Sequence, residues 1–143
     1  MDYKKELEEL ILTVMRENGS DLHLGVGRKP AIRVAGELSF LAKHSVLTKE
    51  DVFGILGEVL EKTKIDKFKE EQEADFSYDF RGQARLRGNA FFQKGSINMA
   101  FRLVPKVQTL EELHLPPILA DITRKKQGFF LVVGPVGQGK STT

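Results

Sequence analysis

The stretch 134–143 has a glycine spacing that restricts the fold of this chain more than any other feature. Its pattern is G-x-x-x-x-G-K-[S/T], with the fixed positions filled by Gly134, Gly139, Lys140 and Ser141. That pattern belongs between a strand and a helix. The preceding run, 129–133, is apolar and partly β-branched, which is typical of a buried strand. The sequence therefore predicts a strand over 129–133, then a loop, then a helix beginning at Lys140.

A loop of this kind binds phosphate with its backbone. Glycines allow successive N–H groups to point at phosphate oxygens, and the following helix adds its positive amino-terminal end. Lys140 is predicted to reach the β- and γ-phosphates and the Ser141 hydroxyl to ligate Mg²⁺. A turn without a ligand is disfavoured, because strand, spacing, lysine and serine agree. The predicted nucleotide-binding residues here are Gly134, Pro135, Val136, Gly137, Gln138, Gly139, Lys140, Ser141 and Thr142.

Length and composition limit the other possibilities. The chain has 143 residues, enough for a domain with a core. Its 22 basic and 20 acidic residues give no argument for a nucleic acid or a strongly acidic partner. It has no cysteine, and His23, His44 and His114 lack metal-ligand spacing. Because no apolar run approaches the ~20 residues of a membrane span and the first residues lack a signal peptide's apolar core, we expect a soluble intracellular protein.

Hydrophobic spacing predicts helices and short strands in the first half of the chain. A first helix is predicted to bury Leu7, Leu10, Ile11 and Val14. Gly19 is its predicted carboxy-terminal cap. A capping box at 48–51 predicts the start of a second helix, and Gly54 and Gly57 within it predict close packing against another element. Alternating apolar residues predict a strand from about Asp21 and two more within 31–41.

Two apolar runs, 84–93 and 96–104, predict a β-hairpin. They are joined by Lys94 and Gly95, and a two-residue turn there places Arg87 opposite Arg102. In this register one face is uniformly apolar or small, which supports it. That face holds Leu86, Gly88, Ala90, Phe92, Ile97, Met99, Phe101 and Leu103.

The opposite face of the hairpin concentrates positive charge. It carries Arg85, Arg87, Asn89, Phe91, Asn98 and Arg102. Like charges directly opposed destabilise a sheet, so an anion is expected beside Arg87 and Arg102. Two explanations stay open. One is an internal carboxylate, such as Asp75 or Asp79 of the preceding strand, or a solvated face; the other is a bound anion, and beside a phosphate loop the natural anion is a phosphate.

Six segments in order resemble the type IV pilus retraction ATPases (the PilT family), within the larger class of type II/IV secretion ATPases. They are 20–24, 32–38, 74–78, 85–91, 101–105 and 134–143. The loop alone is generic. The Ser-Asp-Leu-His-Leu segment at 20–24 and the Arg-x-Arg-x-Asn-x-Phe segment at 85–91 are much more specific. The resemblance runs through essentially the whole chain and corresponds to the amino-terminal half of the family, as far as the Walker A motif.

The resemblance implies an α/β fold in three parts. These are a PAS-like domain with a mixed or antiparallel sheet and flanking helices over 1–105, a linker with short helices over 106–127, and the first strand and Walker A loop of a RecA-like ATPase domain over 128–143. Family members place arginines of the amino-terminal domain near the nucleotide phosphates. Arg85, Arg87 and Arg102 thereby become candidates for sensing the γ-phosphate of ATP, with Mg²⁺ as the accompanying ion.

The resemblance also implies a setting. It implies a ring of identical subunits, usually a hexamer, that is cytoplasmic and peripheral at the inner face of the bacterial inner membrane. There ATP hydrolysis would drive pilus retraction and twitching motility through an inner-membrane platform protein. Neither a nucleic acid partner nor direct membrane insertion is implied. Only one short helix precedes the 20–24 segment, which favours the retraction branch.

Several departures and alternatives bear on this interpretation. Val136 and Gln138 replace the more usual Thr and Ser, and Gly88 stands where a β-branched residue is common. The family's catalytic acidic residues and Walker B strand have no match up to Thr143. We therefore expect the 143 residues alone not to hydrolyse ATP. We also expect 128–143 to be disordered or to pair with the edge of a second chain.

Three functions other than that of a retraction ATPase are compatible with the sequence. One is a stand-alone, non-catalytic interaction module. Another is a relative of the type II secretion or pilus assembly ATPases. A third is single-stranded nucleic acid binding on the face that carries Arg85, Arg87 and Phe91.

Overall fold

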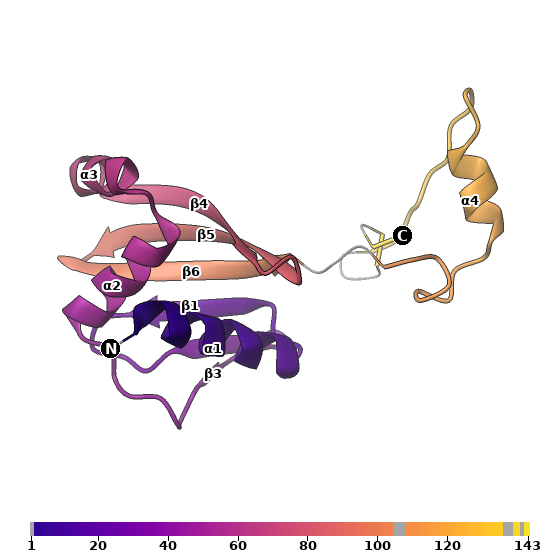
Figure 1. The fold of residues 1–143 in the computed structure, drawn as a ribbon. Helices are drawn as coiled ribbons and strands as arrows, with labels where there is room; N and C mark the ends of the chain where they lie inside the picture. Colours follow the sequence, from indigo (N-terminus) through magenta and orange to yellow (C-terminus); the bar gives the residue numbers. More distant parts are fainter. Residues whose placement is uncertain (1, 105–107, 136–138, 141) are drawn as a thin grey trace. The chain divides into compact units, whose positions relative to one another are not determined.

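The chain forms two compact units, Met1–Pro105 and Lys106–Thr143. The computed structural model describes residues 2–104, 108–135, 139–140 and 142–143 (Figure 1). None of the helices found in these ranges has the length and apolar character needed to cross a membrane. The finer division into a linker over 106–127 and the start of an ATPase domain over 128–143 stays a prediction.

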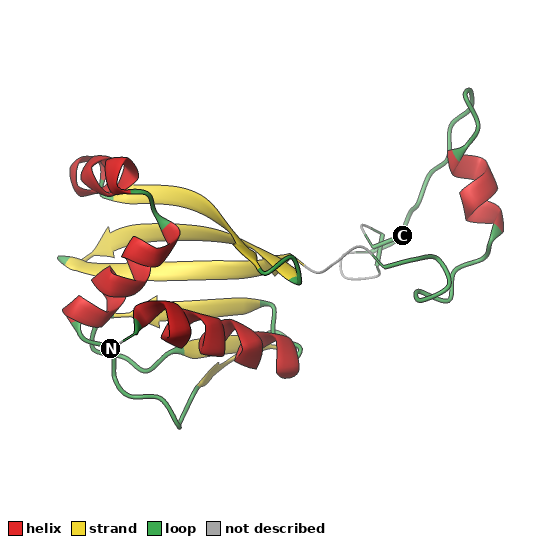
Figure 2. Ribbon diagram, viewed as in Figure 1, coloured by secondary structure: helices red, strands yellow, loops and turns green. Residues whose placement is uncertain are grey.

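The amino-terminal unit is an antiparallel sheet with flanking helices (Figure 2). Its elements are α1 (Tyr3–Arg16), β1 (Asp21–Gly25), β2 (Ala31–Val34), β3 (Glu37–Phe40), α2 (Lys49–Val59), α3 (Lys62–Glu71), β4 (Glu73–Phe80), β5 (Ala84–Gln93) and β6 (Ser96–Val104). The strand order is β3-β2-β1-β6-β5-β4, and every neighbouring pair is antiparallel. Pairing of β1 with β6, far apart in sequence, joins two three-stranded halves. This is the expected α/β class.

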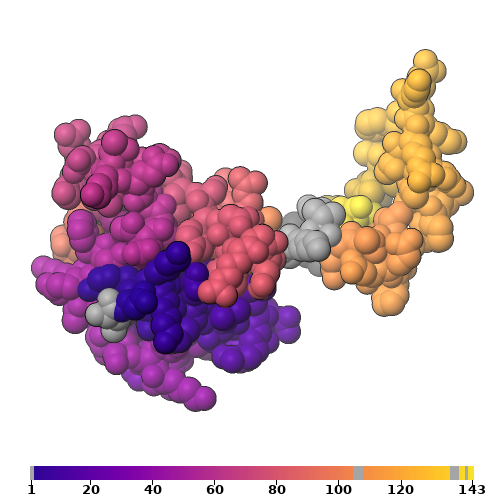
Figure 3. All heavy atoms as spheres, viewed as in Figure 1, coloured from indigo at the N-terminus to yellow at the C-terminus, as the bar shows by residue number. Residues whose placement is uncertain are grey.

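Helices α1 and α2 cover one face of the sheet, and in Figure 3 their atoms overlie the sheet on the viewer's side. The predicted buried face of α1 is confirmed, since its buried residues are Leu7, Leu10, Ile11 and Val14. The capping box at the start of α2 is also present, formed by Thr48 and Asp51. Gly54 lies so close to the ring of Tyr3 that a Cβ there would overlap it. The predicted close packing is therefore confirmed at Gly54, but it is wrong at Gly57, where nothing lies within 4 Å of an added Cβ.

The end of α1 corrects one prediction. Gly19 is not the cap, because the residue in the left-handed conformation is Asn18, with φ of 51°. Asparagine is among the non-glycine residues that adopt this conformation most readily. Gly19 instead donates its N–H to the Val14 carbonyl at 2.8 Å. A Cβ on Gly19 would lie 3.1 Å from the Arg33 carbonyl oxygen, so the glycine permits a close approach of β2.

The β5–β6 hairpin has the predicted register. Arg87 pairs with Arg102 and Gln93 with Ser96, around a turn in which Lys94 and Gly95 both have positive φ. Gly88 faces the ring of Phe76, which would overlap a Cβ at that position. The glycine that departs from the family pattern therefore makes room for a core aromatic.

The carboxy-terminal unit contains one short helix, α4 (Ile118–Thr123), among its described residues. Ahead of α4, Thr109 and Glu112 form a reciprocal capping box, but the residues directly after Thr109 form turns and not a helix. The predicted strand over 129–133 is not formed in this structure, and its side chains are exposed. A strand needs a neighbour for its backbone N–H and C=O groups. The described residues supply none for this segment.

Candidate functional site

A row of charged residues crosses the face of the sheet that points away from α1 and α2. The register of four adjacent strands, β2, β1, β6 and β5, places at successive positions Arg33, Asp21, Arg102 and Arg87. We call these four residues the arginine row. Three guanidinium groups and a single carboxylate share the row, so it carries an excess of positive charge. The hairpin residues Arg87 and Arg102 are brought together as predicted.

Asp21 is the carboxylate that the row contains. Its side chain is only 10% exposed. Its Oδ1 accepts a hydrogen bond from Arg102 Nε at 2.9 Å, and its Oδ2 accepts one from Ser20 Oγ at 2.7 Å. Arg33 Nε lies 3.5 Å from the same Oδ2. Burial acts to raise the pKa of Asp21, but the hydrogen bonds from Ser20 and Arg102 outweigh it and leave the pKa below its usual value. Asp21 is therefore ionised at neutral pH.

The acids suggested by the sequence, Asp75 and Asp79, do not fill this role. Asp75 accepts a hydrogen bond from the Asn89 side chain at 3.0 Å, and Asp79 accepts one from the Gly82 N–H at 2.8 Å. The sequence suggests these two acids because β4 directly precedes β5 in the chain. The acid comes from β1 instead, because β1 pairs with β6. The Ser-Asp-Leu-His-Leu segment at 20–24 contains Asp21, but the sequence does not show that this segment pairs with β6.

Arg87 and Arg85 are exposed, and in the β4–β5 register Ser77 lies opposite Arg87 and Asp79 opposite Arg85. Within the described ranges, no carboxylate forms an ion pair with either of them. Arg102 keeps 74% of its side chain exposed although Asp21 holds its Nε. Three members of the arginine row, Asp21, Arg102 and Arg87, line a broad recess of about 770 Å³. Two neighbouring guanidinium groups can donate several parallel hydrogen bonds to the oxygens of an anion.

His23 lies two residues beyond Asp21 on the same face of the sheet. Its Nε2 is buried and has no hydrogen-bond partner among the described residues. Burial lowers the pKa of its imidazole, so the ring is neutral at pH 7. His23 therefore adds no positive charge to the arginine row.

The predicted phosphate loop lies in the carboxy-terminal unit and is described only in part. Val136, Gly137, Gln138 and Ser141, the predicted Mg²⁺ ligand, lie outside the described residues. Gly139 has φ of 81°, a conformation that L side chains rarely adopt. Lys140 Nζ donates to the Pro135 carbonyl at 2.6 Å, so its amine lies over the loop. Thr143 N donates to the Gly139 carbonyl at 3.0 Å, as in the first turn of a helix.

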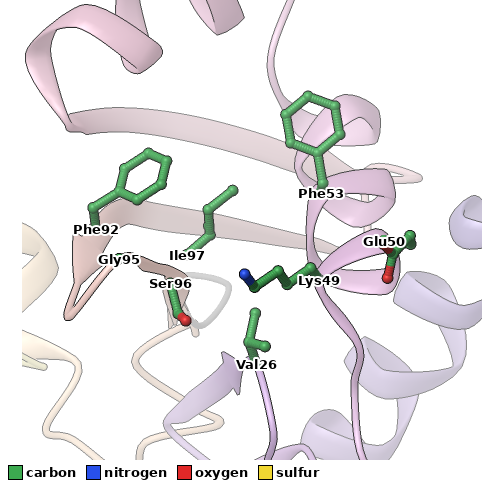
Figure 4. Close-up of a pocket in the computed structure, with 8 residues that line it drawn as sticks. All are labelled: Val26, Lys49, Glu50, Phe53, Phe92, Gly95, Ser96 and Ile97. Atoms are coloured by element: carbon green, nitrogen blue, oxygen red, sulfur yellow. The ribbon is translucent and has the colours of Figure 1, made fainter.

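A separate cavity of about 300 Å³ lies between the start of α2 and the β5–β6 turn (Figure 4). Its walls are mostly apolar, and the Lys49 side chain extends across it toward Ser96. It contains none of the predicted site residues. The described residues also include no cluster of three or more His, Asp or Glu side chains that could hold a metal ion.

Comparisons with known proteins place the chain in a family, although no protein-family model matches it. The type IV pilus retraction ATPase PilT of Pseudomonas aeruginosa is 35% identical over 139 residues, covering 96% of this chain and 40% of PilT. The type IV pilus ATPase PilU of the same organism is 34% identical over 139 residues, covering 96% of this chain and 36% of PilU. The chain thus spans about two fifths of the length of these curated relatives.

The fold agrees with the sequence relationship. A crystal structure of the pilus retraction motor PilT with bound ADP aligns with a TM-score of 0.74 and 33% identity. The alignment covers 94% of this chain and 40% of the other. By sequence over nearly all of its length, and by fold, this chain is therefore a homologue of the PilT and PilU type IV pilus ATPases and belongs to that family.

Proposed function

We propose that this chain forms the amino-terminal domain and the phosphate loop of a hexameric motor ATPase that powers type IV pilus retraction. The observation that carries the proposal is the facing pair Arg87 and Arg102, which remains exposed although Asp21 binds Arg102. In a homologue of pilus motors, the anion that suits this pair is a phosphate of ATP. The proposed division is 1–105 for the domain, 106–127 for the linker and 128–143 for the start of the ATPase domain.

Each proposed ligand-binding residue has a defined task. Lys140 supplies a point charge to the β- and γ-phosphates, and the Ser141 hydroxyl ligates Mg²⁺. Arg87 and Arg102 donate hydrogen bonds to the γ-phosphate, the group that distinguishes ATP from ADP. Arg85, two residue pairs along the hairpin, adds positive potential without facing a second arginine. Bound ATP supplies the reactive phosphoanhydride.

The described residues fit such a ligand. Gly139 takes a conformation compatible with a phosphate-binding turn, and the Lys140 amine lies within reach of the loop backbone. Beyond a phosphate loop, hydrolysis needs a group that positions the attacking water, and we assign that role to none of these residues. We propose that residues 1–143 alone bind nucleotide without turnover.

The proposed setting follows the family. The subunits would form a ring at the cytoplasmic face of the bacterial inner membrane and act on the pilus through a platform protein of that membrane. Neither nucleic acid nor insertion into the bilayer enters the proposal. The expected partner surfaces are therefore those of other subunits and of the platform protein.

Nucleotide binding and turnover by the complete protein test this proposal. Lys140→Ala should weaken Mg²⁺-ATP binding by at least about tenfold, because a charge-assisted contact to phosphate is lost. Arg87→Ala should lower ATP turnover by about tenfold or more. Lys125→Ala and Arg28→Ala, which remove exposed charges elsewhere, are the matched controls. Full turnover by Lys140→Ala would overturn the proposed ATPase, and turnover by residues 1–143 would overturn the proposed inactivity.

A further inference from the structure

Asp21 carries a buried negative charge next to a site that should attract an anion. Among the described residues, it is the one charged side chain in the buried class, at 7% exposure. A buried charge costs free energy unless it is paired and hydrogen-bonded. Its Coulomb interaction with a phosphate beside Arg102 would be repulsive. If Asp21 favours nucleotide binding, it must therefore do so through the arginine side chains that it contacts.

The hydrogen bonds of Asp21 distinguish the two facing arginines. Oδ1 holds Arg102 through Nε at 2.9 Å, which leaves both Nη groups of that guanidinium for a ligand. Oδ2 is itself anchored by Ser20 Oγ at 2.7 Å. Arg87, the cross-strand neighbour of Arg102, has no such anchor within the described ranges. The pair thus combines one oriented guanidinium with one that is free to adjust.

We infer that Asp21 is a positioning residue, which orients Arg102 so that its two Nη groups and the Arg87 guanidinium meet the same terminal phosphate. This inference rests on the proposed function. An exposed arginine samples many rotamers, and fixing it before the ligand arrives removes part of the entropic cost of binding. Asp21 is not itself a contact of the nucleotide.

Replacement of Asp21 by asparagine separates positioning from charge neutralisation, because the two predict changes of opposite sign. Asp21→Asn makes the arginine row more positive, so a mere neutraliser would on removal raise the affinity for any phosphate. Asparagine also weakens the hold on Arg102, because a charge-assisted bond becomes a neutral one. A positioning residue would on removal lower the affinity for a triphosphate.

The experiment measures the affinity of the complete protein for a non-hydrolysable ATP analogue and for ADP, each with Mg²⁺. Asp21→Asn should lower the analogue's affinity about tenfold and leave that for ADP unchanged. Asp75→Asn is the matched control, because it removes a carboxylate that lines the same recess but is bonded to Asn89 and holds no arginine, and it should lower neither affinity. Arg102→Lys, which lacks the planar guanidinium, should lower the ratio of analogue affinity to ADP affinity by a similar factor. The double variant with Asp21→Asn and Arg102→Lys should lower this ratio little further.

The outcomes separate this inference from the proposed function. An unchanged or higher analogue affinity in folded Asp21→Asn, with a loss in Arg102→Ala, would overturn the positioning role alone. An unchanged ratio in Arg102→Ala as well would overturn the proposed role of the arginines. If Asp21→Asn does not fold, Ser20→Ala keeps every charge and removes one anchor. It should lower the ratio by about two- to tenfold, and an unchanged ratio would overturn the inference.

Discussion

Strand β6 and the segment 129–133 are both rich in apolar residues, yet their surroundings differ completely. In β6, Met99 and Phe101 are each 1% exposed, whereas Phe129 is 88% and Leu131 is 64% exposed. Strand β6 has β1 and β5 as neighbours and α2 packed over it. The segment 129–133 has no strand partner among the described residues. Apolar composition therefore makes a strand possible, and neighbours decide whether it forms.

The largest expected difference between the two regions is the cost of truncating an aromatic. Phe101→Ala should reduce the free energy of unfolding by about 3–5 kcal/mol, because it leaves a cavity beside Phe76. Phe129→Ala should change it by less than about 0.5 kcal/mol. Tyrosine fluorescence during urea unfolding measures this, since the chain has no Trp and both tyrosines, Tyr3 and Tyr78, lie in the amino-terminal unit. Equal losses in the two variants would contradict the comparison.

Glycines of the amino-terminal unit test how tightly its core is packed. Gly88→Val should destabilise the unit by about 1–3 kcal/mol, because the added carbons displace the Phe76 ring. Gly57→Ala is the matched control, since nothing lies within 4 Å of a Cβ at that helical position. That control should stabilise by up to about 1 kcal/mol. Thermal unfolding monitored by circular dichroism gives both values, and a neutral Gly88→Val would show a looser core than described.

The two capping boxes offer a further comparison between the units. Thr48→Ala should cost about 1 kcal/mol, because Thr48 caps the 11-residue helix α2 that covers the core. Thr109→Ala removes the same hydrogen bond from a box that only turns follow. Its effect on unfolding of the amino-terminal unit should be within error of zero. The midpoint in urea for the two variants is the measurement, and a larger loss at Thr109 would break the comparison.

The smallest expected effect is on pH dependence. Burial lowers the pKa of His23, so the unfolded state binds its proton more readily than the folded state does. Stability should therefore be full above the ordinary histidine pKa of about 6.5 and decline as the pH falls below it. His23→Gln should flatten this decline. Thermal midpoints between pH 7.5 and about 5 measure it, and an unchanged slope in the variant would assign the decline elsewhere.

The ionisation of Asp21 affects stability at a lower pH than that of His23 does. Its folded pKa is below the ordinary value. The stability it contributes is therefore present above about 3.9 and is lost as the pH falls through the folded pKa. The two groups thus lose their contributions in different pH ranges, and both losses occur on acidification.

Local sequence signals predicted much of the amino-terminal unit. The α1 face follows from helical spacing, the start of α2 from its capping box, and the hairpin register from the Lys94-Gly95 turn. These features depend on residues within a few positions of one another, so a linear sequence contains them. The facing of Arg87 and Arg102 is a consequence of the same local turn.

Features that depend on distant partners were not predictable in the same way. The acid beside Arg102 is Asp21, 81 positions away in the chain. The left-handed residue after α1 is Asn18, because Gly19 is needed where β2 approaches. The predicted strand over 129–133 does not form, because pairing needs a second strand.

The sequence by itself determined several elements of the amino-terminal unit, the hairpin register, the two facing arginines and the family resemblance. All of these are encoded in short-range spacing or in ordered motifs. Only the tertiary structure decided which carboxylate joins the arginines, which arginine it anchors and which apolar runs are buried. The physical reason is that charge pairing and burial depend on which strands become neighbours. The pairing of β1 with β6 joins segments far apart in the sequence and depends on packing of the whole core.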